Sequence, residues 1–107
     1  MIIKNGDIRA SRGEDFRLQF NIREKGEPYK MQLGDRVHMI VKKIMTAEEP
    51  AVIDRMSVGS SVIHIKGSDT EKLMSRKYRY TVHLIKSDGS KHILVDTHNF
   101  EITGGNV

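Results

Sequence analysis

Histidines and carboxylates are the residues of this chain that could do chemistry. The chain has five histidines and 14 Asp and Glu side chains among 107 residues, and it has no cysteine. Such groups bind metal ions when three or four of them converge, and they act as acids and bases when they are paired. Two histidines separated by three residues on a helix could hold zinc, but no pair in this sequence has that spacing. The sequence therefore predicts neither a metal ion nor another cofactor.

The remaining reactive residues are scattered along the chain. The carboxylates that could form an acid–base pair are Asp54, Asp69, Glu71 and Asp96, at spacings typical of loop and edge charges. The serines fall at turns, where their hydroxyls support the backbone, and none lies in the Gly-x-Ser-x-Gly pattern of a nucleophile. The glycines do not form a phosphate-binding loop. We therefore expect that the protein is not an enzyme and has no small-molecule substrate.

Basic side chains outnumber acidic ones, 18 to 14, which gives a net charge of +4. Nucleic-acid binding proteins gather such an excess into a patch, and the densest group here is Arg76, Lys77 and Arg79. Tyr78 and Tyr80 alternate with these residues, as in a strand that turns its aromatics inward and its charges to solvent. We therefore expect no nucleic acid among the partners. The alternative is a small monomeric module that binds nucleic acid through the three basic residues.

The clearest local pattern is a hairpin in the C-terminal third of the chain. Apolar residues occupy every second position of residues 78–84, the period of a strand with one buried face. Asp88-Gly89 suits a two-residue type I′ turn. Pairing outward from this turn predicts the opposed pairs Leu84–Ile93, Val82–Val95 and Arg79–His98.

Other segments carry strand, turn or helix signals. An alternation of apolar and polar residues predicts one strand over Phe16–Arg23, and Asn5-Gly6 is typical of a tight hairpin turn. Ser68 and Glu71 have the spacing of a helix capping box, and only a short helix fits before the next strand. Further strands are expected over 36–43, 51–58, 61–66 and 99–103.

These signals together predict an all-β fold. They indicate about seven short strands separated by turns, which is the pattern of an antiparallel β-sandwich. We expect a single immunoglobulin-like domain over residues 1–107, with one short helical turn near residues 69–75. A small barrel is the alternative. The expected centre of the core is Phe16, Leu18, Phe20, Ile22, Tyr80, Val82 and Leu84.

One face of the predicted hairpin is more apolar than a solvated sheet face. In the predicted register, Ile85 and Leu94 lie on the outward face beside His83 and His92. Solvated faces of antiparallel sheets are mostly polar, and exposed apolar patches mark interaction sites. Either another part of the chain or a partner must cover these residues. We take His83, Ile85, His92 and Leu94 as the candidate interaction surface.

Six segments follow one another in the order Gly6-Asp7, Phe16–Phe20, Leu33–Val37, Asp69–Leu73, Tyr78–Val82 and Asp88-Gly89. This order resembles that of a known family, the N-terminal immunoglobulin-like domain of phage upper baseplate and related tail proteins. In that family a tyrosine-bearing strand, a glycine-containing turn and a strand ending in Phe-x-Ile close the domain, as Phe100-Glu101-Ile102 does here. The resemblance spans most of the chain and implies a virion or prophage structural component. It carries over no set of functional residues.

Self-association and docking are the mode of action that the resemblance implies. We expect a homo-oligomer, or contacts with other phage structural proteins in a tail, baseplate or neck. Ile2-Ile3 and Phe100-Glu101-Ile102 are expected at sheet edges, where unpaired backbone groups can bind another strand. No apolar run is long enough to span a membrane, and the first residues lack the pattern of a secretory signal. We therefore expect cytoplasmic synthesis without a signal peptide, and a place in the virion if the phage interpretation holds.

Overall fold

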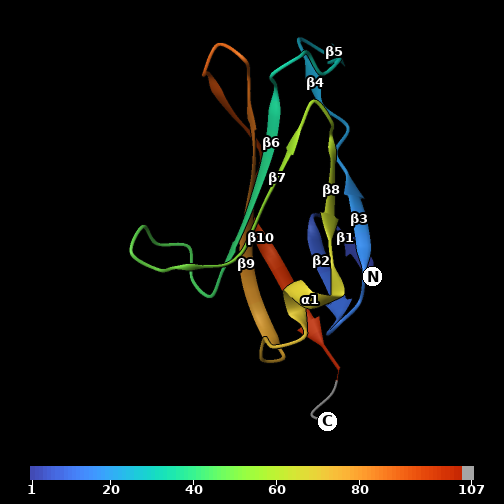
Figure 1. The fold of residues 1–107 in the computed structure, drawn as a ribbon, viewed down its shortest axis with the longest axis vertical. Helices are drawn as coiled ribbons and strands as arrows, with labels where there is room; N and C mark the ends of the chain where they lie inside the picture. Colours follow the sequence, from blue (N-terminus) through green and yellow to red (C-terminus); the bar gives the residue numbers. More distant parts are fainter. Residues whose placement is uncertain (105–107) are drawn as a thin grey trace.

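Ten strands follow one another along residues 1–104 of the computed structural model, which are the residues that the structure describes (Figure 1). The all-β prediction is confirmed. There are more strands than predicted because several have only two or three residues. In chain order the elements are β1 (Ile2–Lys4), β2 (Asp7–Ser11), β3 (Phe16–Gln19), β4 (Arg23–Glu24), β5 (Glu27–Pro28), β6 (Arg36–Lys42), β7 (Ala51–Val58), β8 (Val62–Ile65), α1 (Gly67–Thr70), β9 (Arg76–Ile85) and β10 (Lys91–Thr103).

Six strands form one mixed sheet in the order β1-β2-β10-β9-β6-β7. Neighbouring strands are antiparallel except β2 and β10, which run parallel with Ile8 opposite Phe100. The prediction of a purely antiparallel fold is wrong at this pair, which joins distant parts of the chain. The segment Phe100-Glu101-Ile102 therefore lies inside the sheet, between β2 and β9, and not at an edge. Ile2-Ile3 does form an edge strand, β1, and the predicted turn at Asn5-Gly6 joins it to β2, with both residues at positive φ.

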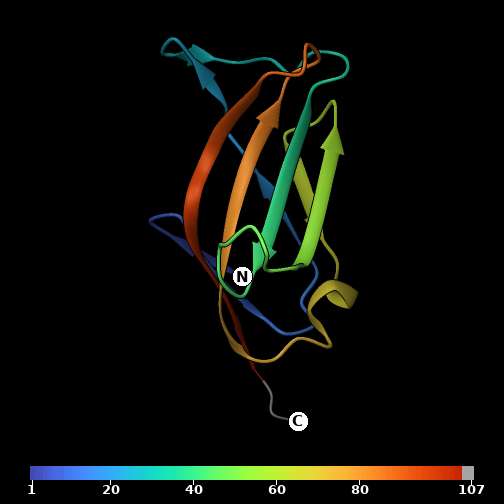
Figure 2. The ribbon, with the colours of Figure 1, turned by 90° about the vertical axis from the view of Figure 1, so that its left-hand side faces the viewer.

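The paired strands β3 and β8 pack on one face of this sheet, and β4 and β5 pair as a small hairpin at one end (Figure 1). We call the opposite face of the large sheet the outer face. Figure 2 shows it, with β10, β9, β6 and β7 side by side and the loop over residues 43–50 standing in front of its lower part. No other strand of residues 1–104 covers the outer face.

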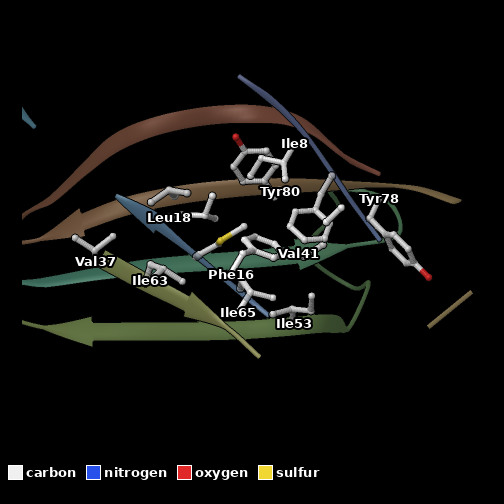
Figure 3. Packing of buried hydrophobic residues seen from close by; sticks show 14 of the residues in the cluster. Ile8, Phe16, Leu18, Val37, Val41, Ile53, Ile63, Ile65, Tyr78 and Tyr80 are labelled. Atoms are coloured by element: carbon white, nitrogen blue, oxygen red, sulfur yellow. The ribbon is translucent and has the colours of Figure 1, made fainter. Parts of the chain in front are cut away.

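The hydrophobic core lies between the two layers (Figure 3). Side chains of β3 and β8 face alternate residues of β6 and β9, and burial of this apolar surface is the main stabilising contribution to the fold. The Phe100 ring packs against Phe16 and Tyr80, with centroid distances of 6.3 and 6.2 Å. The predicted core is confirmed except that Phe20 is only partly buried; the buried members are Phe16, Leu18, Ile22, Tyr80, Val82 and Leu84.

The β9–β10 hairpin forms, but its loop has three residues and not two. The Lys86 C=O accepts a hydrogen bond from the Gly89 N–H, and the Lys86 N–H donates to the Ser90 C=O, both at 2.8 Å. Within the loop only Gly89 has a positive φ, of 90°, which identifies a type I turn followed by a left-handed glycine. The predicted type I′ turn would also need a positive φ at Asp88. The Asp88 carboxylate instead accepts a hydrogen bond from the Ser90 N–H at 2.8 Å.

The extra loop residue shifts the strand register by one position. Leu84 lies opposite His92, and His83 lies opposite Ile93. The predicted pairing of Leu84 with Ile93 is therefore wrong. Because successive residues of a strand point to opposite faces, the shift exchanges the faces of the first residues of β10.

Two irregularities in β10 then change the register again. The first, at Leu94, restores the predicted pairing of Val82 with Val95, which is confirmed. The second lies between Val95 and His98 and sets His98 opposite Tyr80. The prediction that His98 lies opposite Arg79 is therefore wrong.

The predicted strand Phe16–Arg23 is interrupted after Gln19. The chain continues to β4, which pairs with β5, and the Ile22 C=O accepts a hydrogen bond from the Tyr29 N–H at 2.8 Å. The strands predicted over 51–58 and 61–66 are present as β7 and β8. They belong to different sheets and do not pair with each other.

The helical turn α1 begins earlier than predicted, with Lys66 at the N-cap position. The expected capping box of Ser68 and Glu71 is therefore wrong. The carboxylate of Asp69 caps the turn by accepting the Lys66 N–H at 2.8 Å, and it also accepts the Arg55 Nε–H at 3.1 Å. Burial opposes the charge of Asp69, but Arg55 and the Lys66 N–H outweigh burial and hold its pKa below the usual value.

Candidate functional site

The structure divides the predicted interaction surface between two faces of the sheet. His83 and Ile85 are half-buried on the outer face. His92 lies opposite the buried Leu84 and shares its side of the sheet, where it lines a cleft of about 230 Å³ at the end of the hairpin. Leu94 lies at the irregularity of β10 and packs against the core. The three-residue loop explains the position of His92, because it moves residues 91–93 by one position relative to β9, and the irregularity explains the position of Leu94.

The outer face instead carries apolar residues of β7, β9 and β10, with His38 and Arg36 of β6 between them. In the order β7, β6, β9, β10, one row of opposed residues is Met56, His38, His83 and Ile93, and the next row is Val58, Arg36, Ile85 and Lys91. The exposed fractions of Met56, Val58 and Ile93 are 45, 68 and 63 %. Met56 and Val58 share one face of β7, and Ile93 lies three strands away, beyond His38 and His83. Exposed apolar side chains on one sheet face are typical of an interaction site. We call this set the outer-face patch: His38, Met56, Val58, His83, Ile85 and Ile93.

Two histidines form the centre of the outer-face patch. His38 and His83 lie opposite each other on β6 and β9, and the His38 Nε2 is 2.5 Å from the Asp54 Oδ1. Burial lowers the pKa of His83, and the nearby Lys91 and His38 lower it further, while Asp96 opposes them. The His83 ring is therefore neutral at pH 7. A neutral ring costs less to remove from water than an imidazolium, which suits a surface that a partner covers.

Two further histidines contact aspartates elsewhere on the molecule. The His64 Nε2 is 2.7 Å from the Asp15 Oδ1, and the His98 Nδ1 is 3.3 Å from the Asp7 Oδ1. The Asp7 carboxylate also accepts the Asn99 N–H at 3.0 Å; this bond and His98 lower its pKa and fix the start of the β2–β10 pair. Across residues 1–104 no three His, Cys, Asp or Glu side chains converge as metal ligands.

The basic residues Arg76, Lys77 and Arg79 do not form one patch. Arg76 and Lys77 are consecutive in β9 and therefore point to opposite faces. The Arg79 guanidinium donates to the Asn99 Oδ1 at 2.5 Å, and Lys77 lies opposite Glu101. The positive charge of this segment is thus divided between two faces, and the Arg79 guanidinium is held by a neutral amide.

The sequence patterns did not reveal the contribution of β6 and β7 to the outer face. The alternation of residues 36–42 and 51–58 indicates which side chains share a face within each strand. Only the sheet order brings His38, Met56 and Val58 beside the hairpin residues.

No protein-family model matches the sequence, and no curated protein matches it. The helix α1 has four residues, and residues 1–104 contain no helix long and apolar enough to cross a membrane.

Proposed function

We propose that this protein is a non-catalytic structural protein that self-associates and docks onto a larger assembly. The observation that carries the proposal is the outer-face patch, where Met56, Val58 and Ile93 are 45–68 % exposed on a sheet face without a second layer of strands from residues 1–104. Burial of apolar surface contributes about 25 cal/mol per Å². A partner that covers this face therefore gains affinity from it.

The assembly that we propose is a phage or prophage tail, baseplate or neck, with the two layers in an immunoglobulin-like arrangement. The support is the order of sequence features, which resembles that of the N-terminal domain of phage upper baseplate and related tail proteins. The two packed layers of strands are compatible with this resemblance. The partners are then other copies of the chain or other virion proteins.

Sedimentation velocity at tens of micromolar tests the self-association. We expect a species heavier than the 12.2 kDa of one chain, at a fraction that grows with concentration. A strict monomer over this range would contradict self-association and would leave docking to a different protein as the only mode of action.

A further inference from the structure

The free edge of β7 is the longest regular strand edge without a partner in the described part of the chain. β7 has eight residues and pairs only with β6. The other edge strands of residues 1–104 have two to four residues each; they are β1, β3, β4, β5 and β8. Residues 91–99 of β10 also lack a second neighbour, but two register irregularities interrupt that edge. A long free edge exposes N–H and C=O groups that another strand can bind.

The register identifies which backbone groups of β7 point outward. The Gly59 N–H donates to the Asp35 C=O at 2.7 Å, at the position just beyond the pair Val58–Arg36. Hydrogen-bonded and non-hydrogen-bonded pairs alternate along an antiparallel ladder. Ser57 and Arg55 therefore bond to β6, while the backbone groups of Asp54, Met56 and Val58 face away. Within residues 1–104 no hydrogen bond satisfies these outward groups.

β7 also lacks most of the features that protect natural edge strands. Such strands commonly carry lysine, proline, a bulge or an inward-pointing charge. Residues 51–58 include no lysine or proline. The register irregularity lies at the start of the strand, near Ala51. The inward-pointing charge is Arg55, and Asp69 of the same chain pairs with it. The segment from Asp54 to Val58 therefore has a regular register, and none of these protective features blocks its free edge.

We propose that β7 pairs antiparallel with β7 of a second copy, about a two-fold axis at Met56, so that two large sheets become one. This inference rests on the proposed self-association and assigns it to the edge of β7, which leaves the outer-face patch for docking. A second copy fits because its own β7 offers the same unpaired groups in a strand that contains one acidic and one basic residue. Isologous pairing of identical surfaces is also the commonest form of a homodimer.

Repulsion between like charges disfavours some registers of the β7–β7 pair. An axis at Asp54 would oppose two carboxylates, and an axis at Arg55 would oppose two guanidinium groups, both of which are unfavourable. An axis at Met56 sets Arg55 opposite Ser57, and Asp54 opposite Val58, without opposed like charges. It also engages all three outward residues of each strand, whereas an axis at Ser57 would leave Asp54 unpaired.

Cysteine cross-linking tests this register directly, because the chain has no cysteine of its own. In the proposed dimer the two Met56 residues form a hydrogen-bonded pair with Cα atoms about 5.5 Å apart, within the range of a disulfide. The matched control is Asp54→Cys, which changes the same edge and face. Its two copies would lie about 13 Å apart along the strands, which is too far to bridge.

We expect Met56→Cys to form a covalent dimer with oxidised glutathione at least about tenfold faster than Asp54→Cys, because only the first pair lies within disulfide range. Equal rates for the two variants in a chain that sediments as an oligomer would overturn the β7 pairing and leave self-association through another surface. A monomeric parent chain with no preferential cross-linking would contradict both proposals.

A pair of lysine variants tests whether two copies associate through the edge of β7 or through the outer face. Met56→Lys and Ile93→Lys alter exposed side chains in the same row, one at the free edge and one three strands away. We expect Met56→Lys to sediment as a monomer and Ile93→Lys to remain a dimer, with unchanged circular dichroism for both. The reverse result would show that copies associate through the sheet face, and it would overturn the edge pairing.

Discussion

Asp35 links two segments of the chain through one carboxylate that is 1 % exposed. Its Oδ2 accepts hydrogen bonds from the Tyr29 hydroxyl at 2.5 Å and the Gln32 N–H at 2.8 Å, and its Oδ1 accepts the Ser87 N–H at 2.9 Å. The Tyr29 hydroxyl, followed by these N–H groups, lowers the pKa of Asp35. The same contact raises the pKa of Tyr29 to about 12. The carboxylate thereby fixes the β9–β10 loop against the connection that leads into β6.

We predict that Asp35→Asn lowers the free energy of unfolding at pH 7. We also predict that this variant loses less stability than the parent chain between pH 7 and pH 3. An amide nitrogen in place of one oxygen would face at least one N–H donor, of Gln32 or Ser87. Because the pKa of Asp35 is lower in the folded chain, its stabilising contribution is complete above about pH 4 and disappears as the pH falls further. Urea midpoints at pH 7 and pH 3 measure both effects.

The control for this prediction is Tyr29→Phe, which removes one hydrogen bond and keeps both backbone donors. Its urea midpoint should fall less at pH 7, and its acid dependence should stay closer to that of the parent chain. Other aspartates with lowered pKa values will keep part of the acid dependence in every variant. An Asp35→Asn chain with the parent's full acid dependence would contradict the assigned role of the carboxylate.

At the scale of elements, the hairpin shows what the sequence could and could not predict. The alternation of β9 and the pairing of Val82 with Val95 followed from the apolar pattern. The loop length did not, because Asp88-Gly89 serves equally in a two-residue turn and at the end of a three-residue one. Because the loop has three residues, His92 lies on the face opposite to the predicted one. Of the four residues predicted to share the outward face, the structure therefore places His83 and Ile85 there.

We predict that Gly89→Ala destabilises the protein by about 1 kcal/mol, since a left-handed conformation costs an L-residue about 1–2 kcal/mol. The φ of Gly89 is +90°, and an added Cβ would meet no atom within 4 Å, so only the backbone conformation is strained. Ser87→Ala, in the same loop, keeps its Cβ and should change stability by less than about 0.5 kcal/mol. Urea unfolding measures both. Equal stability of the two variants would show that Gly89 does not need its left-handed conformation.

At the scale of the whole molecule, the strand order determines the surface. Local patterns predicted most strands, yet the parallel β2–β10 pair and the position of β7 depend on contacts between distant segments. This order places the outer-face patch beside the free edge of β7. In the proposed dimer, pairing at Met56 would join two such patches into one continuous surface for docking onto a larger assembly.

The distribution of charge leads to the last prediction, that the protein does not bind nucleic acid measurably at physiological ionic strength. The net charge of +4 is spread over both faces, with Arg76 and Lys77 on opposite sides and Arg79 bonded to Asn99. Phosphate binding needs several cations that converge, and its affinity falls steeply with salt as counterions are released. Fluorescence anisotropy with labelled single-stranded and double-stranded nucleic acid, at low and at physiological salt, measures the binding. Micromolar binding that disappears when Arg76, Lys77 and Arg79 are all replaced by Gln would contradict this prediction and favour the monomeric binding module over the assembly protein.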